Sequence, residues 1–219
     1  MKYISAAINV ENHLFWKRDL TLLEIETESD IPKELTVKEV TRENVDDVRE
    51  FRGDSVLKQM KNFQANGCHG AYGYINGACI GHTWLEINHS KGYKLSNEGY
   101  LLLPGENASW YGNVDENFRG KRIINHLRHK CIEVAISHDS NLSLIHILPD
   151  NESGARAHKN TGGIIFEGRA KVLNLLFHTI VFYKANDRWC GFVRIPFMRR
   201  GAGIAWSESH GFGKLLVNN

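Results

Sequence analysis

The sequence predicts an α/β protein built on one sheet that contains both parallel and antiparallel strand pairs. Strand-like and helix-like patterns follow one another in mixed order, with consecutive strands in some places and strand–helix–strand runs in others. The dipeptide Asn76-Gly77 lies between two strand patterns and predicts a tight antiparallel hairpin. With 219 residues, of which 42% are hydrophobic, the chain can bury a sizeable core.

The first predicted elements are a strand and two helices. Leu35–Val40 alternates apolar and polar residues, which is typical of a strand. Thr41 can cap a first helix that ends at Arg52-Gly53, and Ser55–Ala65 forms a second short helix.

The remaining predicted elements are strands and helices in alternation. Their helices are predicted from apolar residues that recur at helical spacing, and their strands from short apolar or alternating runs. The predicted bounds are Gly70–Ile75 and Ala78–Ile87 for the hairpin, Asn107–Val114 for a strand, Ile123 to about His138 for a long helix, Leu142–Leu148 for a strand, Ser153–Thr161 for a short helix, and Ile164–Lys171 and Leu173–Lys184 for two closing strands.

The domain division follows from one boundary signal and one change of pattern. Ile31-Pro32 marks a boundary, because the residue before a proline is disfavoured in a helix. After residue 184 the chain mixes arginine, glycine and aromatic residues without a clear period. We therefore expect an N-terminal extension over residues 1–34, a main domain over 35–184 and a C-terminal extension over 185–219.

Charge and cysteine content favour a soluble, cytoplasmic protein. The formal net charge is only +2, which argues against a general nucleic-acid binder. The four cysteines form no C-x-x-C pair and have no histidine at zinc-finger spacing, so we expect reduced structural thiols and no metal. The N-terminal apolar run is too short for a signal sequence, and no apolar stretch reaches about 18 residues, so we expect no membrane association.

A basic segment before the long predicted helix is the main candidate for a functional site. Arg119, Lys121 and Arg122 stand at or before the first turn, where the helix dipole already places positive charge. Gly120 lets the backbone approach a ligand closely. This combination predicts a site for phosphate or pyrophosphate, although the segment matches neither a P-loop nor a Rossmann fingerprint. The alternative is a solvated basic turn that nearby acidic residues neutralise.

The segment resembles the hallmark of the GNAT superfamily of acyl-CoA N-acyltransferases. That motif, V-x-x-x-x-[RQ]-G-x-G-x-[GA], opens a helix after a strand, and here Val114, Arg119 and Gly120 match it, with Lys121 at a variable position. Two positions depart from the motif. Arg122 stands where the family has Gly, and Ile124 stands where it has Gly or Ala.

A second block strengthens the resemblance, which covers roughly residues 35–184. Asn151, Ser153 and Gly162 align with the family pattern around its last helix, and His158 stands where the family often has tyrosine. The resemblance implies a mixed, mostly antiparallel central sheet flanked by helices. It also implies a coenzyme A site formed by Val114, Arg119, Gly120, Lys121, Arg122, Ile123, Ile124, Asn151 and Ser153.

The activity that the resemblance implies is transfer of an acyl group, by expectation acetyl, from acetyl-CoA to a primary amine of a small molecule or peptide. His158 is the candidate acid that protonates the departing thiolate, because imidazole can donate a proton near neutral pH. Glu86 and Glu98 are candidate bases near strand ends or the polar loop. Tyr111 is a candidate for the acceptor pocket and the alternative acid.

Two other classes of function stay open. The departures at Arg122 and Ile124 favour a coenzyme-A-binding or scaffold protein that no longer turns over. Arginines interleaved with aromatics in residues 188–214 suggest an RNA-associated protein, although an additional strand pair explains the same residues. The sequence also leaves open whether the chain forms a homodimer.

Overall fold

The structure is a computed structural model that describes residues 8–23, 32–92, 94–96, 101–147, 150–175, 178–185, 188–196, 204–205 and 214–215. Its helices are α1 (Val48–Ala65), α2 (Ile123–Ser137) and α3 (Glu152–Asn160), with short 3-10 turns η1 (Leu20–Leu22), η2 (Val45–Asp47) and η3 (Glu116–Phe118). Its strands are β1 (Ile8–Asp19), β2 (Leu35–Glu39), β3 (His69–Ile75), β4 (Ala78–Ile87), β5 (Lys94–Leu95), β6 (Leu101–Leu102), β7 (Glu106–Val114), β8 (Leu142–Ile147), β9 (Ile164–Leu175), β10 (His178–Ala185), β11 (Arg188–Pro196), β12 (Ile204–Ala205) and β13 (Lys214–Leu215).

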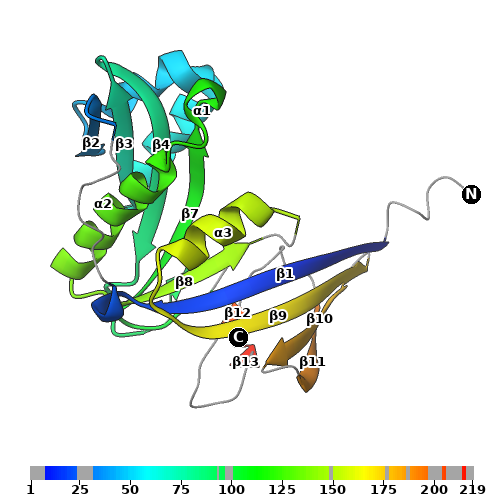
Figure 1. The fold of residues 1–219 in the computed structure, drawn as a ribbon. Helices are drawn as coiled ribbons and strands as arrows, with labels where there is room; N and C mark the ends of the chain where they lie inside the picture. The colour runs from blue at the N-terminus through cyan, green and yellow to red at the C-terminus, as the bar shows by residue number, and fades with distance from the viewer. Residues whose placement is uncertain are drawn as a thin grey trace, which may run out of the picture.

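One large sheet organises the described residues (Figure 1). It has nine strands in the order β11-β10-β9-β1-β8-β7-β4-β3-β2. Only β7 and β8 are parallel neighbours, whereas the other neighbouring strands of this sheet run antiparallel. The predicted mixed, mostly antiparallel sheet flanked by helices is therefore confirmed.

The hairpin between β3 and β4 has the predicted turn. Asn76 has φ 51° and Gly77 has φ 81°, the pair of positive angles that a type I′ turn requires. Asparagine and glycine tolerate these angles better than other residues, so these two residues were enough to predict the turn.

The N-terminal segment supplies an interior strand of the sheet. β1 pairs with β8 on one side and with β9 on the other, both antiparallel. Figure 1 shows β1 and β9 as two long strands that run side by side across the molecule. The segment 1–34, predicted as an extension, thus joins the sheet at its centre, and β11 from residues 185–219 forms one of its edges. The division at residues 34 and 184 stays a prediction.

Two predicted boundaries were wrong. The first predicted helix does not begin after Thr41, whose hydroxyl accepts a hydrogen bond from Glu43 N within a turn (3.2 Å). α1 instead begins at Val48. The predicted break at Gly53 is confirmed, because Gly53 has a non-helical backbone (φ 77°, ψ 178°) that separates two helical segments of α1. Glycine accommodates this positive φ because it has no Cβ.

The second wrong boundary is the end of β9. The sequence predicted a break near Val172, but β9 runs to Leu175, where it pairs with Ile8 of β1. β9 pairs with β1 and with β10 up to Leu175, and a local pattern in β9 does not record such long-range pairing.

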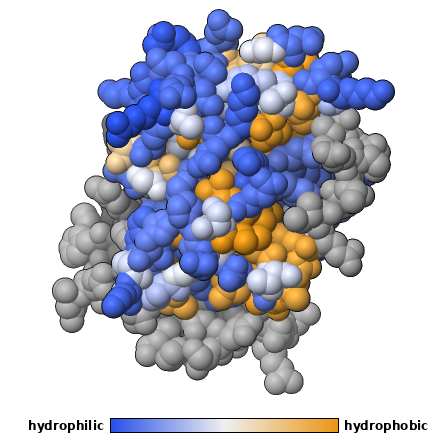
Figure 2. Space-filling model, turned by 90° about the vertical axis from the view of Figure 1, so that its left-hand side faces the viewer, coloured by the Kyte–Doolittle hydropathy of each residue, from blue (hydrophilic) through white to orange (hydrophobic). Residues whose placement is uncertain are grey.

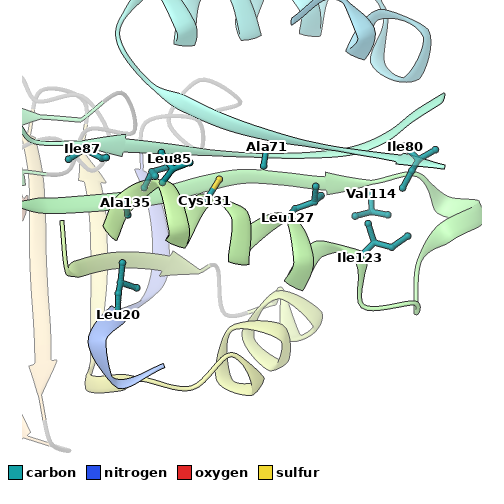
Figure 3. Packing of buried hydrophobic residues seen from close by; sticks show 11 residues of the cluster. Leu20, Ala71, Ile80, Leu85, Ile87, Val114, Ile123, Leu127, Cys131 and Ala135 are labelled. Carbon is teal, nitrogen blue, oxygen red and sulfur yellow. The ribbon is translucent and has the colours of Figure 1, made fainter. Parts of the chain in front are cut away.

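α1 and α2 cover opposite faces of the sheet. On β4, Trp84 packs in the cluster beneath α1, whereas its neighbour Leu85 packs in the cluster beneath α2. Figure 3 shows the α2 cluster, in which the side chains of α2 that face the sheet are spaced four residues apart: Ile123, Leu127, Cys131 and Ala135. This spacing places them on one helical face, as the sequence predicted.

The described surface is largely hydrophilic on the face shown in Figure 2, where hydrophobic side chains gather mainly in a band across the middle and lower part.

Among the helices that the structure describes, none is both long enough and apolar enough to cross a membrane. In the same part of the chain, no three His, Cys, Asp or Glu side chains are grouped so that they could hold a metal ion.

Candidate active site

The pairing between the parallel strands β7 and β8 stops before β7 ends. Their ladder runs from Glu106↔Leu142 to Ser109↔Ile145, although β7 continues to Val114. The backbone of β7 beyond Ser109 therefore has no partner in β8. An opening between two adjacent parallel strands exposes main-chain donors and acceptors that a ligand can use.

A β-bulge in β7 lies just past the last β8 pair. Tyr111 has φ 54°, an uncommon angle for a non-glycine residue, and the register with β4 shifts between His82 and Trp84. A bulge bends its strand and increases the local twist. We infer that this bulge directs the end of β7 away from β8.

A cavity of about 610 Å³ lies at this opening, a volume in the range of small-molecule sites. The end of β7, the loop before α2, the first turns of α2 and one side of α3 contribute to its lining. The lining residues are Gly112, Asn113, Val114, Phe118, Arg119, Gly120, Arg122, Ile123, Ile124, Asn125, Arg128, Asn151, Ser153, Gly154, Arg156, Ala157 and Asn160.

The start of α2 forms the basic wall of this cavity. No side chain caps the helix, and its first turn contains no acidic residue. Gly120 and Arg122 both have left-handed backbone angles (φ 81° and 55°), so the loop makes two sharp changes of direction before the helix. The uncapped N–H groups and the helix dipole favour an anion at this wall.

The acidic residues next to Arg119 interact with it only weakly. Arg119 Nη1 lies 3.8 Å from Glu116 Oε1, and both side chains are largely exposed, so the pair is weak. Asp115 instead accepts a hydrogen bond from Asn117 N (2.9 Å) and caps η3. The Arg119 guanidinium is held by a hydrogen bond from Nε to Val114 O (3.2 Å), which keeps it beside the cavity.

Most residues predicted to hold the cofactor lie around this one cavity. Those that line it are Val114, Arg119, Gly120, Arg122, Ile123, Ile124, Asn151 and Ser153. Lys121 is not among the lining residues, and its Nζ lies over the Phe118 ring, 5.4 Å from the centroid. Three of the four loop residues 119–122 therefore line the cavity, and their role in holding a cofactor stays a prediction.

Asn151 contributes to the site as a helix cap. Its Oδ1 accepts hydrogen bonds from Gly154 N (2.9 Å) and from Ser153 Oγ (3.2 Å). These bonds hold the N-terminus of α3 against the cavity. The motif at Asn151 and Ser153 thus has a structural role that the sequence analysis did not identify.

The acid role predicted for His158 does not fit its position. His158 does not line the large cavity, and its side chain is buried at 7% exposure, with its ring 6.4 Å from that of Trp16. Burial, together with the cations Arg128 and Arg18, lowers the pKa of His158 well below 6.5. A histidine in these surroundings stays neutral near pH 7 and is a poor proton donor.

Two further predicted catalytic residues, Tyr111 and Glu86, do not line the cavity. Tyr111 stacks on the buried His82 ring, with centroids 5.4 Å apart and planes inclined by 26°. Glu86 is buried and its Oε1 lies 3.1 Å from Lys94 Nζ. Glu98 lies outside the described residues.

The sequence analysis did not identify several residues that line the cavity, among them Gly112, Arg128 and Arg156. Arg128 had a readable signal. It follows Leu127 and lies four residues after Ile124 and three before Cys131, next to the apolar face of α2. A charged residue beside such a face is unusual and could have been marked as a candidate.

Comparison with known proteins gives a fold and no closer relative: no family model and no curated protein sequence matches the chain. A GCN5-related glucosamine N-acetyltransferase region of a fungal multi-domain GH3 β-N-acetylglucosaminidase is similar in structure, with TM-score 0.53 and 12% identity over 74% of this chain and 20% of that chain. A tandem GNAT protein from the clavulanic acid biosynthesis pathway has TM-score 0.50 and 12% identity over 87% and 55%. A Drosophila protein has TM-score 0.51 and 11% identity over 78% and 52%.

The chain has the GNAT fold. It spans 20% of the fungal chain and about half, 55% and 52%, of the other two. At identities of 11% and 12% the likeness concerns the GNAT fold alone. The activity must therefore be argued from the residues of the site.

Proposed function

We propose that the chain is an N-acyltransferase that moves an acyl group from acyl-coenzyme A to a primary amine of a small molecule or peptide. The observation that carries this proposal is the cavity at the opening between β7 and β8, which has the uncapped start of α2 as its basic wall. The proposal joins this geometry to the GNAT fold and to the sequence motif from Val114 to Ile124.

The described residues fit the chemistry of coenzyme A. Arg119, Arg122 and the free N–H groups of the first turn of α2 suit the pyrophosphate. The unpaired backbone of β7 beyond Ser109 suits the amide groups of the pantetheine arm, because it offers main-chain donors and acceptors. A cavity of about 610 Å³ can hold much of such an arm.

In the proposed reaction, the acceptor amine attacks the thioester carbonyl carbon and the thiolate of coenzyme A leaves. The bound thioester supplies the activated acyl group. The chain supplies orientation within the cavity, and backbone N–H groups of β7 near the bulge at Tyr111 stabilise the developing oxyanion. A neutral amine is the species that attacks, so the reaction is expected to accelerate as pH rises toward the pKa of the acceptor.

A second candidate function is acyl-coenzyme A binding without turnover. The residues that line the large cavity include no carboxylate and no histidine, so none of them is a base for the acceptor amine. Glu86, one of the two predicted bases, is committed to Lys94. A protein that binds acyl-coenzyme A and releases no free thiol with any amine would match this second candidate.

Ligand binding tests both candidates. Acetyl-CoA at 100 times its Kd should stabilise the fold by about 2.7 kcal/mol, which thermal unfolding would record as a higher Tm, whereas free acetate should leave Tm unchanged. Arg119→Ala should reduce the shift. Arg42 is an exposed arginine that does not line the cavity, so Arg42→Ala is the matched control and should retain the full Tm shift.

Turnover then separates the two candidates. Release of free coenzyme A thiol in the presence of a panel of primary amines would support the acyltransferase. Absence of a Tm shift at millimolar acetyl-CoA and coenzyme A would refute acyl-coenzyme A binding, and with it both candidate functions.

A further inference from the structure

Arg128 of α2 lines the large cavity and a second, small cavity next to it. The small one measures about 10 Å³ and His158 lines it too, and no residue other than Arg128 is common to these two linings. The small cavity is also lined by Ser109, at the last β7–β8 pair, and by Ser143 of β8. Arg128 therefore lies where the opening between the two parallel strands begins.

Arg128 is also deeper than the basic loop. α2 starts at Ile123, and a helix rises about 1.5 Å per residue, so Arg128 lies roughly 8 Å further along the helix axis. Arg119 and Arg122 stand at the loop and are exposed. The cavity thus has two separate groups of positive charge along its length.

The charge of Arg128 is not neutralised by the described residues. Its Nη1 is shielded from solvent and has no hydrogen-bond partner. The two cavity linings contain no carboxylate. Burial, with the nearby cation Arg18 as a smaller cause, lowers the pKa of Arg128 to about 10, which still leaves it charged at neutral pH.

Arg18 differs from Arg128 because it already has partners. Its Nη2 donates to His158 O (2.6 Å) and its Nε donates to Gly162 O (2.9 Å). Arg18 therefore caps carbonyl groups at and just after the C-terminal end of α3. The arginine left for a ligand is therefore Arg128. Arg128 is half-buried, and its Nη1 is shielded from solvent without a hydrogen-bond partner. Such a nitrogen is costly, and a functional site is the usual place for such a cost.

We propose that the acyl group carried into this cavity ends in a carboxylate, which pairs with the Arg128 guanidinium. This inference rests on the proposed function, because it places the pyrophosphate at Arg119 and Arg122 and the acyl end at the floor. Guanidinium and carboxylate form paired, charge-assisted hydrogen bonds, and Ser109 and Ser143 line the small cavity that adjoins Arg128. The donor class is then the coenzyme A half-thioester of a short dicarboxylic acid.

The test compares donors of equal length. Titration calorimetry on the full chain would measure coenzyme A, butyryl-CoA and succinyl-CoA with the unaltered protein and with Arg128→Met. Succinyl-CoA should bind about ten- to a hundredfold more tightly than butyryl-CoA, because a hydrogen bond between charged groups contributes that much. Arg128→Met should remove this preference and leave free coenzyme A binding nearly unchanged.

Arg156→Met is the matched control, because Arg156 also lines the cavity but stands on the exposed side of α3. It should affect the three ligands by the same factor and preserve the preference for succinyl-CoA. In the absence of ligand, Arg128→Met should raise Tm, since it removes a half-buried guanidinium whose Nη1 is shielded from solvent without a partner. A lower Tm would reveal a structural partner for Arg128 and overturn the inference.

The other outcomes are equally distinct. Equal affinities for succinyl-CoA and butyryl-CoA would overturn the carboxylate and leave the proposed function standing. An equal loss for free coenzyme A and succinyl-CoA in Arg128→Met would place Arg128 at the phosphates. If no coenzyme A species binds to the unaltered protein, the proposed function and this inference fall together.

Discussion

Ile124 of α2 packs directly on Gly112 of β7: a Cβ placed on Gly112 would lie 2.8 Å from Ile124 Cδ1. The GNAT motif that the sequence resembles has a small residue at the position of Ile124. Here the added bulk on the helix is matched by missing bulk on the strand, so α2 and β7 keep their close approach. The two residues are therefore expected to depend on each other.

Gly112→Ala should destabilise the protein by about 1 kcal/mol, the low end of the cost of overpacking, because the atom that the new methyl group meets is the movable end of the Ile124 side chain. Ile124→Ala in the same chain should recover most of this loss, because it removes the atom that the new methyl group meets. Urea unfolding of the two single variants and the double variant measures the coupling. Gly92→Ala is the control, because a Cβ there meets nothing within 4 Å; additive effects at Gly112 and Ile124 would contradict the contact.

Arg122 adopts a left-handed conformation (φ 55°, ψ 12°) at the position where the motif has glycine. Arg122→Gly and Arg122→Ala remove the same charge, but only glycine relieves the backbone strain. We expect the Gly variant to be more stable than the Ala variant by about 1 kcal/mol. Coenzyme A affinity should fall equally in both. Equal stability of the two variants in thermal unfolding would show that this backbone conformation is not strained.

Two buried histidines predict a loss of stability in mild acid. Burial, with a smaller effect of Arg52, lowers the pKa of His82 to about 4, and the pKa of His158 also lies well below 6.5. Below pH 6.5 the unfolded chain binds protons at these histidines and the folded chain does not. The free energy of unfolding should therefore fall as pH drops from 6.5 toward 4, by about 1.4 kcal/mol per pH unit for each histidine.

Urea unfolding at pH 7.5, 6 and 5 checks this dependence. His82→Leu and His158→Leu should each reduce its slope, because each removes one group that the unfolded state protonates. A variant with the slope of the unaltered protein would show that its histidine is already protonated in the folded state or does not titrate in this range.

His158→Leu also tests the catalytic role that the sequence suggested. Because His158 is buried away from the large cavity, we expect kcat to stay within a few-fold of the unaltered value, whereas loss of a general acid would lower it by about 10²–10⁴. Leucine fills much of the imidazole volume and limits the damage to packing. A fall of kcat in the larger range, with unchanged folding, would restore His158 to the reaction.

The buried ion pair between β1 and β7 should be important for stability. Lys17 Nζ lies 2.7 Å from Glu106 Oε1, and both side chains are less than one tenth exposed. Lys17→Met should cost about 3–5 kcal/mol, because it leaves the Glu106 carboxylate buried without its cation. The double variant Lys17→Met, Glu106→Gln should recover much of this loss. The exposed pair Lys130–Glu133, 2.9 Å apart, is the control and should contribute less than about 1 kcal/mol.

Local chemistry made several parts of the fold predictable. The Asn76-Gly77 turn, the bounds of β4 and the start of α2 depend on neighbouring residues: two that tolerate positive φ, a run of strand-forming residues, and apolar residues at helical spacing. The basic loop at the start of α2 could be marked as a candidate site for the same reason, since cations at the start of a helix are unfavourable without a ligand.

The sequence by itself thus determined the hairpin, the long helix and the loop that lines the cavity, because each of these depends on residues within a few positions of one another. Only the tertiary structure decided that β1 lies between β8 and β9, that His158 is buried beside Arg18, and that Arg128 forms the floor of the cavity. The first two relationships join segments more than a hundred residues apart, and the third depends on how a helix packs on the sheet. Local patterns do not encode such contacts, because burial of apolar surface by the whole chain selects them.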